Sequence, residues 1–291
     1  MHTQLLGIDW GTSNRRAYLI ARDGRCLARH EDNQGLLAIG GRFPEALEAL
    51  RRSMGVSSET PVLMSGMVGS AHGWQEVPYL DSALALACLP ENVTKVRGQE
   101  RCAIVPGYVC RNDGVDVMRG EESQLLGATA LGIFDGWLVL PGTHSKWVHL
   151  QAGAIQQLHT YMTGEMYAML GAGGTLAALM ANGSDDEAAF DMGLDEARAG
   201  KPLTHALFGI RARVVAGSMP ASMAKSYVSG LLIGTEFAAA RAHHAEGITL
   251  VASHALSERY AKASARYGMT VRVLDPDQVY CAALAQFFDR V

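Results

Sequence analysis

The amino-acid sequence predicts an α/β protein made of two similar halves, each organised around a strand that ends in a glycine turn. In the first half, the apolar run at residues 5–8 leads to Asp9, and the chain turns at Gly11 before another run begins. In the second half, the apolar run at residues 137–140 turns at Gly142 and continues into a further run. Short apolar runs bounded by glycine are typical of buried strands. Their repetition indicates an internal duplication, and 291 residues suffice for two domains with cores of their own.

Both glycine turns carry hydroxyl groups that suit phosphate chemistry. Thr12 and Ser13 follow the first glycine, and Thr143 follows the second. A glycine lets backbone N–H groups approach anionic oxygens, and an acid at a strand tip, such as Asp9, can hold a hard cation directly or through water. For the first turn alone, a hairpin whose aspartate merely starts a turn is the alternative. The second Gly-Thr turn favours a shared phosphate site.

Composition excludes several classes of protein. The net charge is −4 and no basic patch interleaved with aromatic residues occurs, so nucleic acid is not an expected partner. No apolar stretch is long enough to span a bilayer, and the first residues lack the pattern of a signal peptide. An odd number of cysteines without C-x-x-C spacing argues for reduced thiols in the cytoplasm. The five cysteines are Cys26, Cys88, Cys102, Cys110 and Cys281.

Along the first half, strands are expected at residues 16–21, 26–31 and 61–64. A helix is expected at 43–54, with Pro44 in its first turn and Gly55 at its end. The third strand leads into a glycine-rich loop, and loops at strand ends of α/β sheets commonly bind ligands. A solvent-exposed loop with its tryptophan folded onto the domain is an equal alternative. The residues of interest in this loop are Gly66, Met67, Trp74 and Tyr79.

Acidic residues gather where the halves join. A strand at 102–105 and a polar crossover at 111–114 precede a helix that opens near Glu121 and Glu122 and ends near Gly132. Acids at a helix start are also expected from the helix dipole alone. The second half continues with strands at 145–150 and 154–159 and helices from 163 to about 245, including 165–181 and 222–243. It closes with strands at 248–253 and 271–274 and helices at 255–267 and 278–290.

Six ordered segments carry a resemblance to the actin-like sugar kinase superfamily, which includes hexokinase, glycerol kinase and Hsp70. Within it the chain resembles the 2-dehydro-3-deoxygalactonokinase family over nearly its whole length. The resemblance implies a two-lobed actin-like ATPase fold, ribonuclease H-like, with duplicated mixed-sheet domains and a helical insert in the second. It implies lobes at 1–117 and 118–291, with the C-terminal helix 278–290 packing back on the first. The segments are 8–14, 66–79, 118–122, 140–147, 162–165 and 230–234.

The resemblance also implies an activity. A kinase of this family would use ATP and Mg²⁺ to phosphorylate the terminal hydroxyl of 2-dehydro-3-deoxy-D-galactonate to the 6-phosphate, with Mg-ATP held between the two Gly-Thr hairpins. It would be cytoplasmic, without a nucleic-acid or membrane partner, and could form a homodimer. The alternatives are a kinase for 2-dehydro-3-deoxygluconate, an ATP-driven clamp like Hsp70 or actin, and a sugar-binding regulator without catalysis.

Residue roles follow from matching the family's segments. Asp9 is expected to hold magnesium, and Glu121 to act as the base, with Glu122 second. Asp116, which lies outside the matching segments, is the third candidate. Arg16 and Arg119 are candidates for the substrate carboxylate, and the loop residues Gly66, Met67, Trp74 and Tyr79 for the rest of the sugar acid. Lys146 either adds a charge at the phosphates or is a solvated strand residue. The phosphate and nucleotide ligands would be Gly11, Thr12, Ser13, Gly142, Thr143 and, where the family's glycines are replaced by Val251-Ala252-Ser253-His254, Ser253.

Overall fold

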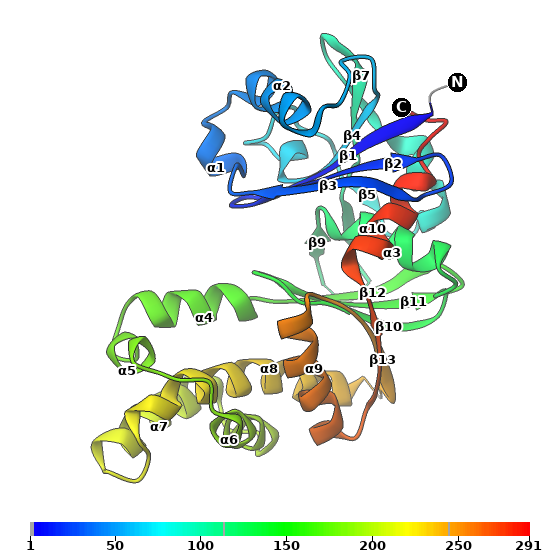
Figure 1. The fold of residues 1–291 in the computed structure, drawn as a ribbon. Coiled ribbons are helices and arrows are strands. Elements are labelled where there is room, and N and C mark those ends of the chain that lie inside the picture. The colour runs from blue at the N-terminus through cyan, green and yellow to red at the C-terminus, as the bar shows by residue number, and fades with distance from the viewer. Residues whose placement is uncertain (1–2, 113, 244) are drawn as a thin grey trace. The chain divides into compact units, whose positions relative to one another are not determined.

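The computed structural model describes residues 3–112, 114–243 and 245–291 (Figure 1). Contacts group the chain into two compact units. Unit 1 contains residues 1–138, 148–159 and 274–291, and unit 2 contains residues 139–147 and 160–273. Unit 1 therefore includes residues 118–138 and the last helix, whereas the sequence-based division began the second lobe at residue 118. That functional division into lobes stays a prediction.

Unit 1 is built on a six-stranded mixed sheet with the order β3-β2-β1-β4-β7-β6. The first three strands form an antiparallel meander, and β1, β4 and β7 run parallel. The two central strands are buried on both faces because apolar residues fill them, as parallel strands require. The strands are β1 (Gln4–Trp10), β2 (Arg15–Ala21), β3 (Cys26–Asp32), β4 (Val62–Gly66), β6 (Thr94–Val96) and β7 (Gln99–Ile104).

A five-stranded sheet repeats this plan with the order β12-β11-β10-β13-β14. Its strands occur in the same relative order as β3-β2-β1-β4-β7, so the duplication predicted from the two glycine turns is confirmed. The boundaries between the units fall inside several strands of this sheet. The strands are β10 (Gly136–Leu140), β11 (Ser145–Gln151), β12 (Ala154–Tyr161), β13 (Gly247–Val251) and β14 (Thr270–Leu274).

Four α-helices complete unit 1: α1 (Leu36–Ile39), α2 (Phe43–Met54), α3 (Glu121–Ala130) and α10 (Pro276–Ala285). α10 packs closely on α3, where a side chain at Gly127 would collide with the carbonyl oxygen of Val279. The last helix ends at Ala285 rather than at residue 290, because residues 286–290 form turns. Short 3-10 segments occur at η1 (Met67–Gly69) and η2 (Leu86–Asn92).

Unit 1 also holds a small sheet that the sequence did not predict. It joins β5 (Leu80–Asp81), β8 (Tyr108–Cys110) and β9 (Asp116–Met118) in the order β5-β8-β9. β8 and β9 are antiparallel, with Cys110 opposite Asp116. The segment at 111–114, of which residue 113 lies outside the described residues, therefore connects two neighbouring strands and is not the crossover between the halves.

Helices dominate unit 2 between β12 and β13 (Figure 1). The expected single helix at 165–181 is wrong, because Gly173 and Gly174, the latter with φ +76°, separate two helices there. Gly193 and Gly230 let α6 and α8 pack closely, since a side chain at either would collide with the other helix's backbone. No described helix is long and apolar enough to cross a membrane. The helical elements are α4 (Thr163–Ala172), α5 (Ala177–Ala181), α6 (Glu187–Arg198), α7 (Leu203–Val215), η3 (Ala221–Met223), α8 (Ala224–Ala242) and α9 (His254–Tyr267).

Candidate functional site

Three segments of unit 1 meet at Asp9: the ends of β1 and β4 and the start of α3. The parallel pairing of β1 and β4 places Asp9 beside Ser65. The Cβ position of Gly66 (φ +88°) lies 3.3 Å from Asp9 Oδ1, and that of Gly120 (φ +112°) lies 3.3 Å from the Cα of Gly66. Two glycines with left-handed φ thus let the backbones of β4 and α3 approach the carboxylate. An acid at the carboxyl ends of parallel strands, facing a helix start, occupies the usual ligand-binding edge of an α/β sheet.

The carboxylate of Asp9 lies in a partly enclosed, charged environment. Burial raises the pKa of Asp9, the Arg16 guanidinium opposes this shift, and Glu31 adds to it. Arg16 Nη1 lies 3.7 Å from Asp9 Oδ2, and Arg16 Nε lies 3.3 Å from Glu31 Oε1. The Asp9 side chain keeps 28% of its surface exposed, so a ligand or cation can reach it.

The first hairpin, which follows β1, packs against Gly35 on one side and is exposed to solvent on the other. The Gly11 N–H donates to the Asn14 carbonyl at 3.0 Å, which closes the turn. Gly35 fits directly against the turn, and its N–H donates to the Ser13 carbonyl at 3.2 Å. Thr12 and Ser13 remain exposed. The hairpin is therefore a supported loop that presents two hydroxyl groups.

The two glutamates at the start of α3 differ in environment. The Glu121 carboxylate accepts a hydrogen bond from the backbone N–H of Arg119 at 3.1 Å, and Glu121 is half-buried. The Glu122 carboxyl group accepts the Gly120 N–H at 2.7 Å but is completely buried, and its Oε1 has no hydrogen-bond partner among the described residues. Burial, with a contribution from Glu121, raises the pKa of Glu122 to about 8. At neutral pH Glu122 is therefore mostly protonated, and only Glu121 is reachable from outside.

This burial predicts a pH-dependent stability. Between pH 4.5 and about 8 the folded protein keeps the Glu122 proton, whereas the unfolded chain releases it. Raising the pH therefore favours unfolding, and the free energy of unfolding should fall by up to about 1.4 kcal/mol per pH unit in this window. Glu122→Gln should flatten that slope in urea titrations at several pH values, while Glu45→Gln on the exposed face of α2 should leave it unchanged. Equal slopes in the unaltered protein and in Glu122→Gln would contradict this prediction.

Arg119 joins the loop at 66–79 to the start of α3. Its Nη2 donates to the Val77 carbonyl at 2.7 Å, and its guanidinium lies 4.2 Å from the ring centroid of Tyr79. Its Nε and Nη1 are buried and have no hydrogen-bond partner among the described residues. Buried guanidinium N–H groups are costly to leave unpaired, which makes Arg119 a candidate for an anionic ligand.

Within the same loop, Trp74 packs against the core of unit 1. Its ring stacks on Phe43 with centroids 5.8 Å apart, and the backbone N–H of Trp74 donates to the Val68 carbonyl at 2.8 Å. The structure thus shows the tryptophan folded onto the domain. Gly66 and Met67, at the end of β4 and the start of η1, lead into this loop, and their contact with a sugar acid stays a prediction.

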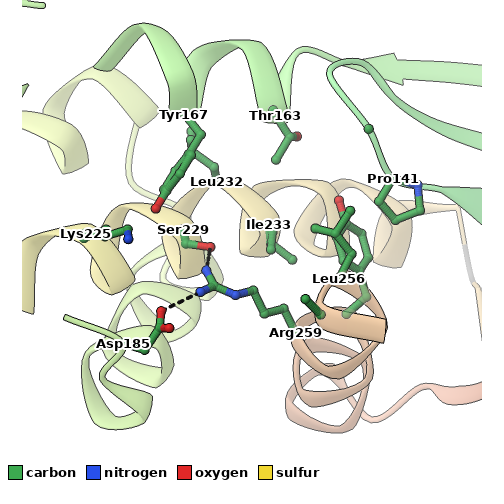
Figure 2. Close-up of a pocket in the computed structure, with 14 residues that line it drawn as sticks. Pro141, Thr163, Tyr167, Asp185, Lys225, Ser229, Leu232, Ile233, Leu256 and Arg259 are labelled. Carbon is green, nitrogen blue, oxygen red and sulfur yellow. Dashed lines mark hydrogen bonds and ion pairs between the residues drawn. The ribbon is translucent and has the colours of Figure 1, made fainter. Parts of the chain in front are cut away.

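Unit 2 contains a pocket of about 400 Å³ (Figure 2). Arg259 crosses it, donating from Nη1 to Ser229 Oγ at 2.7 Å and from Nη2 to Asp185 Oδ1 at 2.9 Å. Of the residues singled out in the sequence, Gly142 lines the pocket. Its walls come from the second hairpin, from α4, α8 and α9, and from the loop before α6: Pro141, Gly142, Thr163, Gly164, Tyr167, Asp185, Lys225, Ser229, Leu232, Ile233, Ala255, Leu256, Arg259 and Tyr260.

The other residues predicted in unit 2 lie close to this pocket in sequence. Thr143 is exposed, and its carbonyl accepts the Glu165 N–H at 2.9 Å. Ser253 is exposed at the start of α9, two residues before the lining residue Ala255. Lys146 is only 6% exposed and donates to Thr160 Oγ1 at 2.9 Å, so its interpretation as a solvated strand residue is wrong.

Sequence reasoning missed most of the pocket walls. Lys225, Ser229 and Arg259 lie on helices whose residues look like ordinary helix-surface positions in the sequence. The one available signal was the pair Gly230 and Gly234, which indicated close packing or a ligand beside that helix. The structure shows close packing of both glycines against α6, while the adjacent Ser229 lines the pocket.

The acidic residues of unit 1 fit a magnesium site that relies on few protein ligands. Within the described residues, no group of three or more His, Cys, Asp or Glu side chains could hold a metal. Mg²⁺ commonly binds one or two carboxylates, with water and substrate phosphates completing its octahedron. The partly exposed carboxylate of Asp9, beside a hairpin that presents hydroxyl groups, meets that requirement.

The chain is similar to known proteins in sequence and in structure. The sequence matches the family described as 2-keto-3-deoxy-galactonokinase over residues 9–287. It is 35% identical over 287 residues to the 2-dehydro-3-deoxygalactonokinase of Escherichia coli (strain K12), covering 98% of this chain and 97% of that protein. A crystal structure of a candidate 2-dehydro-3-deoxygalactonokinase from Sinorhizobium meliloti is 34% identical and superposes with a TM-score of 0.89, covering 97% of this chain and 94% of that one.

A more distant structure supports the fold alone. The activator of 2-hydroxyisocaproyl-CoA dehydratase from Clostridium difficile, with bound ADPNP, is 12% identical with a TM-score of 0.55, covering 98% of this chain and 93% of that one. Together with the duplicated strand order, this likeness establishes the actin-like ATPase fold. The chain belongs to the 2-keto-3-deoxy-galactonokinase family of kinases.

Proposed function

We propose that the protein uses ATP to phosphorylate the terminal hydroxyl of 2-dehydro-3-deoxy-D-galactonate, giving the 6-phosphate. The observation that carries this proposal is the convergence of β1, β4 and α3 on Asp9, where Gly66 and Gly120 leave the carboxylate open beside the first hairpin. The names of the relatives supply the substrate. In phosphoryl transfer, positioning and charge neutralisation provide most of the catalysis, and this arrangement of acid, helix start and supported loop suits both.

The nucleotide would use both hairpins. We assign the phosphates to the loop Gly11–Ser13 and to Gly142 and Thr143, and the base and ribose to the pocket in unit 2 that Gly142 lines. A pocket with apolar walls from Leu232, Ile233 and Leu256 and a few polar groups is typical of a small-molecule site. Asp9 would hold Mg²⁺, which neutralises charge on the transferring phosphoryl group.

We assign the general base, which removes the proton from the substrate hydroxyl, to Glu121. The base must be ionised near neutral pH and must reach the hydroxyl. Glu121 is half-buried at the first turn of α3, where the helix dipole favours its carboxylate. Glu122 is buried and mostly protonated, which leaves it as a structural residue under the helix start.

Arg119 is the better candidate for the substrate carboxylate. Arg16 is already paired with Asp9 and Glu31, whereas two guanidinium nitrogens of Arg119 have no partner among the described residues. A guanidinium can bind a carboxylate through two parallel hydrogen bonds. Bound substrate would satisfy those nitrogens while Tyr79 supports the guanidinium from its face.

We expect Arg119→Lys to raise the KM for the sugar acid about 10- to 100-fold, because an ammonium group cannot form the bidentate pair. The KM for ATP should hardly change. Arg111→Lys, an exposed arginine bonded to Asp81 in the same unit, is the matched control and should leave both values unaltered. An equal rise in both KM values for Arg119→Lys would show that Arg119 only anchors the loop.

A coupled assay of ADP formation tests the function itself. ATP with 2-dehydro-3-deoxy-D-galactonate should give rapid turnover, the gluconate-derived epimer much slower turnover, and ATP alone almost none. Faster turnover with the epimer would reassign the substrate. ATP hydrolysis that does not depend on either acid would instead support a nucleotide-driven clamp.

A further inference from the structure

One buried carboxylate in unit 2 has no role in the proposed chemistry yet bonds to two residues that line the pocket, Thr163 and Tyr260. Glu236 lies in the middle of α8 and is completely buried. Its Oε2 accepts hydrogen bonds from Ser145 Oγ at 2.9 Å and from Trp147 Nε1 at 2.7 Å. Its Oε1 accepts from Tyr260 OH at 2.8 Å and from Thr163 Oγ1. Four donors from β11, α4 and α9 therefore converge on one side chain of α8.

These hydrogen bonds offset the cost of burying the carboxylate and also connect three elements to α8. A carboxylate without partners in a protein interior is very costly, and partners that satisfy all of its lone pairs reduce that cost. Burial raises the pKa of Glu236, while the donors from Thr163, Trp147, Tyr260 and Ser145 oppose the shift. An apolar side chain at this position would avoid that cost but would leave the four donors without this acceptor. The acid thus serves as the shared acceptor for three elements, and its hydrogen bonds fix their geometry relative to α8.

The elements that it joins shape the nucleotide pocket. Thr163 and Tyr260 line the pocket themselves. Ser145 is the first residue of β11 and directly follows the second hairpin. The residue after Thr163 is Gly164, where any side chain would collide with the carbonyl oxygen of Gly142.

The start of α4 is also joined to the hairpin directly. The Glu165 N–H donates to the Thr143 carbonyl at 2.9 Å, and the Glu165 carboxylate lies 2.7 Å from His144 Nε2. The second hairpin is thus bonded to the first turn of α4 and is followed directly by Ser145. Both Ser145 and Thr163, the first residue of α4, donate hydrogen bonds to Glu236.

We propose that Glu236 is a positioning residue of the nucleotide site, which sets the second hairpin, the first turn of α4 and the middle of α9 around the bound nucleotide. The proposal rests on the proposed function, because it takes the pocket as the place of the ATP base and ribose. Glu236 is buried beneath the pocket and acts through Ser145, Thr163 and Tyr260.

Two single-donor variants separate positioning from general stability. Ser145→Ala removes the support at the hairpin exit, whereas Trp147→Phe removes the other donor to the same oxygen from a side chain that does not line the pocket. Both should lower Tm. At a temperature well below both Tm values, Ser145→Ala should raise the Kd for ADP about tenfold in titration calorimetry, and Trp147→Phe should change it by less than about twofold.

Changes at Glu236 itself test whether contacts or charge matter. In Glu236→Gln the amide oxygen can accept from Ser145 and Trp147, and the amide nitrogen can donate to the Thr163 and Tyr260 hydroxyls. This variant should therefore keep ADP binding, whereas Glu236→Leu should lose it about as strongly as Ser145→Ala or more. The KM for ATP should follow the Kd, while the KM for the sugar acid, assigned to unit 1, should stay constant.

Several results would overturn the proposal. ADP binding that is unaltered in Ser145→Ala and in folded Glu236→Leu would show that Glu236 only stabilises the core. An equal rise in Kd for Ser145→Ala and Trp147→Phe would indicate general loosening of unit 2. If the unaltered protein binds no ADP, the proposed function fails and this proposal fails with it, an outcome distinct from the other two.

Discussion

Asp9→Asn is expected to lower kcat by about 10³-fold or more without unfolding the protein. The substitution keeps the shape of the side chain but removes the charge that would bind Mg²⁺ at the end of β1. The loss corresponds to several kcal/mol of transition-state stabilisation. kcat should be measured at saturating ATP and sugar acid over a magnesium titration, and the deficit should persist at the highest magnesium concentration.

The same variant should keep or raise Tm. Burial raises the pKa of Asp9 even with Arg16 beside it, so the charged carboxylate is costly in the folded protein at neutral pH. A neutral amide removes that cost. Asp81→Asn, at an exposed position of unit 1, serves as the control for both measurements. Activity of Asp9→Asn close to that of the unaltered protein would refute the assignment of the metal ligand.

Glu121→Gln should lower kcat strongly, whereas Glu122→Gln should not. Loss of a general base typically costs about 10²- to 10⁴-fold in kcat, and we expect this loss for Glu121→Gln with little change in the KM for ATP. Glu122→Gln should leave kcat nearly unchanged, because an amide resembles the protonated acid that the buried site already holds. The pair should be compared under single-turnover conditions, which isolate the chemical step from product release.

Each of the two glutamate variants is the matched control for the other. Successive residues on a helix point about 100° apart, so both carboxyl groups cannot face the same hydroxyl. If Glu122→Gln loses activity and Glu121→Gln does not, the buried acid must become exposed when substrate binds. The base would then be the second of the two glutamates.

Much of the fold followed from local patterns in the sequence. The glycine turns after β1 and β10 predicted the duplicated meanders, and Pro44 and Gly55 marked the ends of α2 as the structure has them. These features depend on neighbouring residues, where glycine, proline and apolar spacing act directly on the backbone. Asp9 and the glutamates of α3 were found for the same reason, because each lies at the end of an element.

The pocket in unit 2 could not be predicted in this way. Arg259 of α9, Ser229 of α8 and Asp185 of the loop before α6 are distant in sequence, and only tertiary packing makes them neighbours. Glu236 lies within a largely apolar helix, and nothing in its local sequence distinguishes a solvated acid from a buried one. The difference between Glu121 and Glu122 also required the structure, because both fit the same motif and only burial separates them.

The contacts of α10 with α3 and β2 affect how the chain folds during synthesis. Tyr18 of β2 donates a hydrogen bond to Asp277 at the start of α10, a partner 259 residues later in the chain. Unit 1 therefore cannot be completed until α10 has been synthesised, whereas the residues of unit 2 all emerge before α10. Contacts so distant in sequence form slowly, since a long loop must close first. The nascent protein should expose the α10-binding face of α3 until late in translation, which makes that face a natural target for chaperones.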